Sequence, residues 1–179
     1  GYYLVVLIAI LITKFPTPLN LPNINVIILI FTVFYITNLL QRSFLGDNGT
    51  YIISIFMSLF VISFININKN ISPILALNLL WYPAFENLFT IIRRININKK
   101  VYLADDLHFH TLLKNKLINS KQNFIISNSM TGVLMNLIMS ISILISVNYY
   151  NDPKVLLTIL LSNITIYMLI YFIFLSKKS

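Results

Sequence analysis

Long apolar runs alternate along the chain with short polar segments. A bilayer core of about 30 Å needs roughly 20 apolar residues in a helix to cross it, and several runs come close to or exceed that length. Because lipid offers the backbone no hydrogen-bond partner, each run is predicted to be a helix. The pattern predicts an all-α, polytopic transmembrane helix bundle of about six spans, at about residues 2–13 (cut short), 26–41, 50–66, 73–92, 123–147 and 155–175.

Composition agrees with a membrane location. The 179 residues are 58% hydrophobic and 10% charged, and their mean hydropathy is +0.83. Soluble domains usually carry about 25% charged residues. We expect a single membrane domain over residues 1–179, and the absence of cysteine excludes disulfides and thiolate metal sites.

The basic residues divide unevenly between the two predicted ends of the bundle. One end carries Lys14, Lys69 and Lys154, whereas ten lie at the other: Arg42, Arg93, Arg94, Lys99, Lys100, Lys114, Lys116, Lys121, Lys177 and Lys178. The positive-inside rule makes the richer end cytoplasmic, together with the C-terminus and the loop over residues 93–122. We therefore expect a multi-pass protein of the plasma membrane or of a bacterial inner membrane. Nucleic acid is not an expected partner, because no soluble domain carries a binding groove.

Asp47 lies in the sequence FLGDNGT at the predicted cytoplasmic end. Acidic residues at a membrane face are costly unless they are paired, solvated or bound to a cation. One interpretation makes Asp47 part of a turn or a helix cap, as Asp and Gly commonly are. The other makes it a ligand for a hard cation such as Mg²⁺ that bridges substrate phosphates. The two interpretations are compatible.

A second polar segment, ADDLHFH, contains Asp105, Asp106, His108 and His110. Residues two apart do not share a face of a helix, whereas an extended or looped backbone would direct both imidazoles the same way. A zinc site lacks a clear third-ligand spacing. A solvated loop is the plain alternative, but imidazoles that contact a phosphate or nucleotide, with Arg and Lys nearby, fit this basic loop better.

Glu86 lies inside an apolar run, three residues after Pro83. Proline removes a backbone donor, so Pro83 is predicted to kink this span. Glu86 is interpreted either as a partner in an interhelical hydrogen bond or as a residue that faces a cavity.

Three segments, taken in order, resemble motifs of the polyprenyl-phosphate N-acetylhexosamine-1-phosphate transferases, which are glycosyltransferase family 4. Residues 44–50 resemble the motif F-[LM]-G-D-x-G-S, and residues 83–94 resemble a proline–acid helix that ends in paired arginines. Residues 104–110 resemble the loop A-D-x-x-H-[IL]-H-H. The resemblance covers nearly the whole chain, since two further spans follow the last motif as in that family.

The resemblance implies a cytoplasmic cleft that binds a UDP-sugar, by default a UDP-N-acetylhexosamine, together with Mg²⁺ or Mn²⁺. It implies that the phosphate of a polyprenyl lipid attacks the sugar-linked phosphorus and releases UMP, in cell-envelope glycan synthesis. Carried over by motif, Asp47 would hold the metal and diphosphate, and His108 and His110 would act as catalytic residues in the nucleotide and pyrophosphate site. The residues assigned to substrate binding are Asn38, Arg94 and Asp105.

The sequence also departs from the family pattern. Thr111 stands where another histidine is usual, Asp106 where arginine is frequent, and Thr50 where serine is customary. The aspartate-rich motifs of the family's N-terminal half are absent before Asp47. We therefore expect the chain to be the C-terminal half of a transferase and to be inactive alone.

Two other interpretations remain open at this stage. The chain could be a transporter segment, or a degenerate transferase half that only packs against partners. Charged residues that line midplane helices would favour a transporter, but apart from Glu86 the spans carry almost none. The sequence is compatible with a homodimer, and it specifies neither the sugar nor the polyprenol length.

Overall fold

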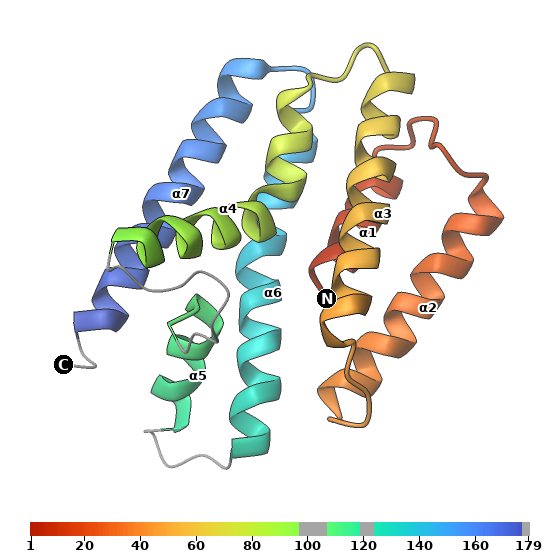
Figure 1. Cartoon of the computed structure of the whole chain (residues 1–179). Helices are drawn as coiled ribbons and strands as arrows, with labels where there is room; N and C mark the ends of the chain where they lie inside the picture. The colour runs from red at the N-terminus through yellow and green to blue at the C-terminus, as the bar shows by residue number, and fades with distance from the viewer. Residues whose placement is uncertain (97–106, 119–123, 177–179) are drawn as a thin grey trace.

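The computed structural model describes residues 1–96, 107–118 and 124–176, and these residues contain seven helices and no strand (Figure 1). The helices are α1 (Tyr2–Ile12), α2 (Leu21–Leu39), α3 (Gly46–Ile67), α4 (Ile74–Asn96), α5 (Phe109–Ile118), α6 (Phe124–Asn148) and α7 (Pro153–Ser176). The predicted all-α membrane bundle is confirmed.

Four helices are long and apolar enough to cross a membrane: α3, α4, the Ser127–Asn148 part of α6, and α7. The helix α1 and the Asn23–Leu39 part of α2 are apolar but shorter. At 1.5 Å per residue, the 11 residues of α1 rise by about 16 Å, which is roughly half of the hydrocarbon core. Among the residues that the structure describes, the predicted number of about six spans is therefore corrected to about four.

Three connections that carry or adjoin single lysines meet at one end of the bundle. The Asn68 side-chain amide donates a hydrogen bond to the carbonyl oxygen of Pro16 at 2.8 Å. The backbone N–H of Ser72 donates to the carbonyl oxygen of Tyr150 at 2.9 Å. The structure therefore gathers the connections beside Lys14, Lys69 and Lys154, which the sequence had predicted to share one side.

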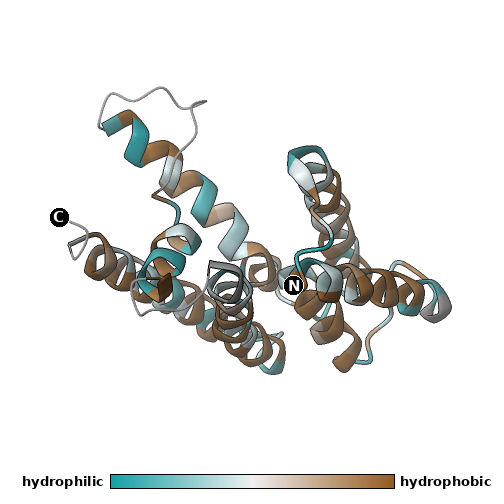
Figure 2. Cartoon of the chain, turned by 90° about the horizontal axis from the view of Figure 1, so that it is seen from below, coloured by the Kyte–Doolittle hydropathy of each residue, from teal (hydrophilic) through white to brown (hydrophobic). Residues whose placement is uncertain are grey.

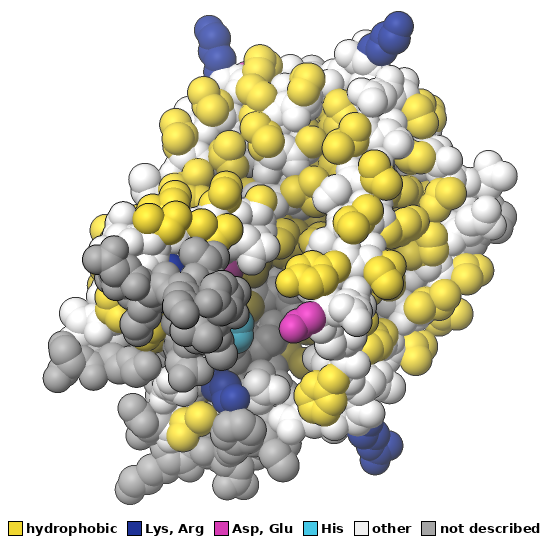
Figure 3. All heavy atoms as spheres, in the orientation of Figure 1, with side chains coloured by type: hydrophobic (Ala, Val, Ile, Leu, Met, Phe, Trp, Pro, Cys, Tyr) yellow, Lys and Arg dark blue, Asp and Glu magenta, His cyan; other side chains and the backbone are white. Residues whose placement is uncertain are grey.

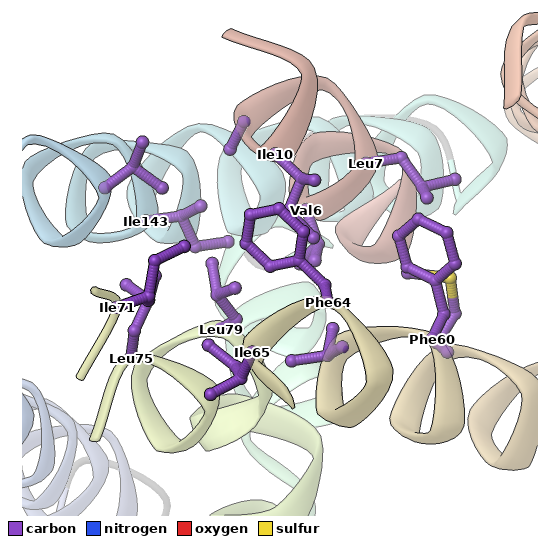
Figure 4. Packing of buried hydrophobic residues seen from close by; sticks show 14 of the residues in the cluster. Val6, Leu7, Ile10, Phe60, Phe64, Ile65, Ile71, Leu75, Leu79 and Ile143 are labelled. Carbon is purple, nitrogen blue, oxygen red and sulfur yellow. The ribbon is translucent and has the colours of Figure 1, made fainter. Parts of the chain in front are cut away.

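Two groups of buried apolar side chains hold the helices together. The first group packs α1 against α3, α4 and α6, and Figure 4 shows Phe60 and Phe64 of α3 lying against Leu7 and Ile10 of α1. The second group joins α4, α5, α6 and α7 through Trp81, Phe109, Leu112, Met135, Met139, Tyr167 and Tyr171. This second group fixes α5 beside the helices that cross the membrane.

The helix α4 changes direction at Pro83, as predicted. Proline has no N–H, so the carbonyl of Leu79, four residues earlier, loses its partner within the helix. The hydroxyl of Tyr2 on α1 supplies the missing hydrogen bond at 2.9 Å. In Figures 1 and 2 the remainder of α4 runs sideways across the bundle instead of continuing along it.

After the bend, α4 has one face of buried polar residues and another that exposes apolar residues. Glu86, Thr90 and Arg94, spaced four apart and therefore on one face, are buried. Leu88 and Ile92 are 58% and 56% exposed. A soluble amphipathic helix has the reverse arrangement. Apolar side chains likewise cover much of the outer surface (Figure 3), as expected for helices that face lipid chains.

Candidate functional site

Glu86 is at the centre of a buried polar cluster just after the bend in α4. Its side chain is largely buried, and its Oε1 accepts a hydrogen bond from the backbone N–H of Phe109 at 3.1 Å. Its Oε2 accepts a hydrogen bond from the Tyr167 hydroxyl at 2.5 Å. A buried carboxylate is stable only when such partners replace water. Glu86 thus ties α4 to the first residue of α5 and to α7.

His108 makes its contact with Glu86 immediately before α5 begins. The Nδ1 atom lies 3.2 Å from Glu86 Oε1 and 3.4 Å from the Thr90 hydroxyl oxygen. The His108 side chain remains 27% exposed. One edge of the imidazole is therefore held by α4, and the ring retains access to solvent.

His110 stacks on His108. Their ring centroids lie 5.6 Å apart, with an angle of 14° between the planes. His108 precedes the helix and His110 lies in its first turn, so the irregular backbone brings both rings to one side as expected. The pKa of His110 is lowered, chiefly because its ring is partly removed from water and then because His108 repels a positive charge on it.

Aromatic side chains surround this cluster. The Tyr167 ring packs edge-on against Phe85 and Phe89, with centroids 5.2 Å and 5.8 Å away. The hydroxyl of Tyr171, one turn further along α7, donates a hydrogen bond to the carbonyl oxygen of Leu107 at 3.1 Å. This bond anchors the residue directly before His108 and so restricts the backbone that carries the imidazole.

Asp47 lies apart from this cluster, in the first turn of α3, and its side chain is exposed. The helix begins at Gly46, whose φ of +67° is a conformation that glycine adopts without a steric penalty. No contact joins Asp47 to His108 or His110 in the described part of the chain.

Asn38 stabilises the turn that leads to Asp47. Its side-chain amide donates a hydrogen bond to the carbonyl oxygen of Ser43 at 2.9 Å. The hydroxyl groups of Thr37 and Ser43 lie 2.7 Å apart and hold the same turn. Asn38 therefore has a structural role, and its assignment to substrate binding stays a prediction.

Of the other predicted site residues, Arg94 is buried on the α4 face that carries Glu86 and Thr90. Asp105 lies outside the described residues. Within the predicted loop over residues 93–122, residues 93–96 complete α4 and Phe109–Ile118 forms α5. The helix α5 was not predicted, because this segment is largely polar. Only two of its residues, Phe109 and Leu112, are buried.

Within residues 1–96, 107–118 and 124–176, no three acidic or histidine side chains are close enough to hold a metal ion by themselves. A Mg²⁺ ion does not require three protein ligands, because it is usually bound by one or two carboxylates together with substrate phosphates and water. The exposed carboxylate of Asp47 suits that kind of shared site. The imidazoles of His108 and His110 are less suited to a hard cation.

An apolar groove between α6 and α7 leads to the cluster. Its volume is about 430 Å³, and its lining includes Ile138 and Ile141 of α6 and Ile166 of α7. Trp81, Phe109 and Tyr167 also line it. Since Phe109 and Tyr167 both bind Glu86, the groove is continuous with the residues that position the histidines.

Glu86, Thr90 and Tyr167 were not assigned to the site from the sequence. The spacing of Glu86, Thr90 and Arg94 was a usable signal, because three polar residues four apart in an apolar helix mark one face. Tyr167 is 81 residues away from Glu86 and lies in an apolar helix, where no local pattern indicates its contact.

The fold and the cluster define a helical membrane protein with a carboxylate–histidine pair between its helices. No family model matches the chain, and no curated protein or solved structure matches it either. The resemblance to the polyprenyl-phosphate transferases therefore rests on the three sequence motifs alone.

Proposed function

We propose that this protein takes part in transferring a sugar-1-phosphate, by default N-acetylhexosamine-1-phosphate, from a UDP-sugar to polyprenyl phosphate. The observation that carries the proposal is the stacked pair of His108 and His110, held at the start of α5 by Glu86. Both histidines belong to the third motif that resembles the transferase family, and Glu86 belongs to the second. The positive-inside rule puts this site on the cytoplasmic side, where nucleotide sugars are available.

The reaction is a phosphoryl transfer. An oxygen of the lipid phosphate attacks the phosphorus that bears the sugar, and the oxygen bridging the two phosphorus atoms of the UDP-sugar leaves with UMP. The product is a polyprenyl-diphosphate sugar. Catalysis of this kind depends mainly on positioning the phosphates and neutralising their charge. Imidazoles beside basic residues are suited to that task.

Asp47 is the proposed ligand for the Mg²⁺, or Mn²⁺, that accompanies the diphosphate. A bound cation of this kind neutralises the phosphate oxygens and orients the two substrates. The carboxylate is free to serve in this way because it is exposed and lies at a helix start. Asn38 supports it by holding the preceding turn through Ser43.

The groove between α6 and α7 supports the choice of a lipid acceptor. Its lining is almost wholly apolar, with isoleucine side chains from both helices. An isoprenoid chain already lies in hydrocarbon in the bilayer, so such a groove would hold it through van der Waals packing and not through removal from water. Because the groove reaches Phe109 and Tyr167, a chain lying in it would bring its phosphate close to the histidine pair.

The position of a phosphorus label tests the proposal. Membranes from cells that express the full-length gene product are incubated with polyprenyl phosphate, Mg²⁺ and UDP-GlcNAc labelled with ³²P at its β-phosphate. We expect the label to appear in an organic-soluble lipid and unlabelled UMP to be released. Chelation of the divalent cation should abolish the transfer, and re-addition of Mg²⁺ should restore it.

Two results would contradict the proposal. Release of labelled UDP with transfer of the sugar alone would indicate ordinary glycosyl transfer. Absence of any labelled lipid with UDP-GlcNAc and with UDP-GalNAc would leave a non-catalytic membrane protein as the better interpretation. Membranes with His108→Ala serve as the matched control, and they should form labelled lipid far more slowly.

A further inference from the structure

The two oxygens of Glu86 have different partners and therefore separable roles. Oε2 accepts the hydrogen bond from the Tyr167 hydroxyl and so connects α4 with α7. Oε1 accepts the N–H of Phe109 and lies against Nδ1 of His108, so it determines how α5 begins. A residue needed only to join helices would not require the contact between Oε1 and the His108 imidazole.

The contact with Oε1 determines which nitrogen of His108 carries the hydrogen. An ionised carboxylate can only accept hydrogen bonds, so Nδ1 must be the donor across the 3.2 Å separation. In a neutral imidazole the other nitrogen, Nε2, then has no hydrogen and presents its lone pair. The ring cannot turn over without breaking the contact with Glu86, while its partial exposure leaves an edge accessible.

We propose that Glu86 is a positioning residue, which holds His108 as the Nδ1–H tautomer and directs Nε2 toward the reacting phosphates. When Nε2 takes up a proton, the adjacent carboxylate stabilises the imidazolium, and the new N–H can donate to a phosphate oxygen. The same division of labour between a carboxylate and an imidazole occurs in hydrolytic triads. The identity of the phosphates rests on the proposed function, whereas the tautomer does not.

The first test measures the tautomer directly by ¹⁵N NMR of the histidine-labelled full-length protein. Comparison with His108→Gln assigns the signals of His108, because they are the signals that disappear in this variant. We expect neutral His108 to carry its hydrogen on Nδ1. Glu86→Gln should convert this into a mixture of tautomers, whereas Tyr167→Phe should lower the unfolding temperature and leave the tautomer unchanged.

The second test separates positioning from folding by kinetics. Glu86→Gln keeps the size of the side chain but removes its charge, and we expect kcat to fall about ten- to a hundredfold with little change in KM for the UDP-sugar. Glu86→Asp should recover part of this loss, because it restores a carboxylate. Asp152→Asn, which changes a carboxylate to an amide at the opposite end of the bundle, should retain wild-type kcat.

Some outcomes would overturn the inference. One is that neutral His108 carries its hydrogen on Nε2 in the wild-type protein. Another is that Glu86→Gln and Tyr167→Phe have equal effects on stability, kcat and tautomer, which would make Glu86 purely structural. If the tautomer is as expected but no labelled lipid forms, the proposed function fails while the positioning of His108 by Glu86 stands.

Discussion

Two aspartates at the beginnings of membrane helices use their carboxylates differently. Asp152 accepts hydrogen bonds from the backbone N–H groups of Lys154 and Val155, at 3.0 Å and 3.2 Å, and so caps α7. Asp47 lies in the first turn of α3, where the N-cap residue is Leu45, and accepts no hydrogen bond from the residues that the structure describes. Asp47 therefore does not cap α3 in the way that Asp152 caps α7, and its assignment as a cation ligand stays a prediction.

The stacking of the two imidazoles affects the protonation of His110. His110 is partly removed from water, and His108 and Lys114 both repel a positive charge on it, while Glu86 acts in the opposite sense. We expect His110 to titrate below the ordinary value of 6.5 in histidine NMR spectra of the folded protein. Because the folded protein binds this proton less readily than the unfolded chain, this site lowers stability as the pH falls below 6.5.

The variant His108→Gln separates the causes of this shift. Removing the neighbouring imidazole should raise the His110 pKa, because one source of repulsion is lost. The shift should not vanish, since the partial removal from water remains. A His110 midpoint at or above 6.5 in the wild-type protein would contradict this account of the histidine pair.

At the scale of the elements, α4 is the helix that creates the site. Its first part runs along the bundle, and its second part turns sideways after Pro83 and carries Glu86, Thr90 and Arg94 on a covered face. A straight helix would direct these residues elsewhere. The bend is stable because Tyr2 of α1 satisfies the carbonyl oxygen of Leu79. The geometry of the site therefore depends on a contact between the first and fourth helices.

A double-mutant cycle tests this dependence. Tyr2→Phe leaves the buried carbonyl of Leu79 unsatisfied, and we expect it to lower the free energy of unfolding by about 1 kcal/mol. In a Pro83→Ala background the new N–H can bind that carbonyl, so the same change should cost much less. Unfolding of the detergent-solubilised protein with SDS measures both differences.

The neighbouring tyrosine provides the matched control for the cycle. Tyr3→Phe removes a hydrogen bond from α1 to Ser54 on α3, which does not involve α4. Its cost should be the same with Pro83 and with Ala at that position. Equal costs for Tyr2→Phe in the two backgrounds would show that Tyr2 does not compensate for the proline.

The helices that coincide with long apolar runs could be predicted from the sequence. Each of the six runs forms a helix, because a backbone in lipid must satisfy its own hydrogen bonds. The number of spans was less predictable, since α1 is only 11 residues long. The helix α5 was missed because its ten residues are mostly polar or partly exposed. Its position depends on tertiary contacts of Phe109 and Leu112.

At the scale of the whole molecule, the sequence predicted which connections share an end of the bundle. It did not predict the contacts that form the site between the helices. The three connections with single lysines lie together, as the division of charge required. The histidine pair was recognised from its motif, and the structure confirms that the two rings lie together. The contacts of Glu86 join residues 23 and 81 positions away, so no local pattern could indicate them.

The central claim is that Asp47 and the histidine pair serve one phosphoryl transfer. Its most direct test is the rate of ³²P transfer to lipid in membranes that contain equal amounts of full-length wild-type, Asp47→Asn or Asp152→Asn protein. We predict that Asp47→Asn lowers the rate at least a hundredfold (about 2.7 kcal/mol) and that Asp152→Asn leaves it near the wild-type value. Undiminished transfer by Asp47→Asn, at an equal amount of folded protein, would contradict the claim.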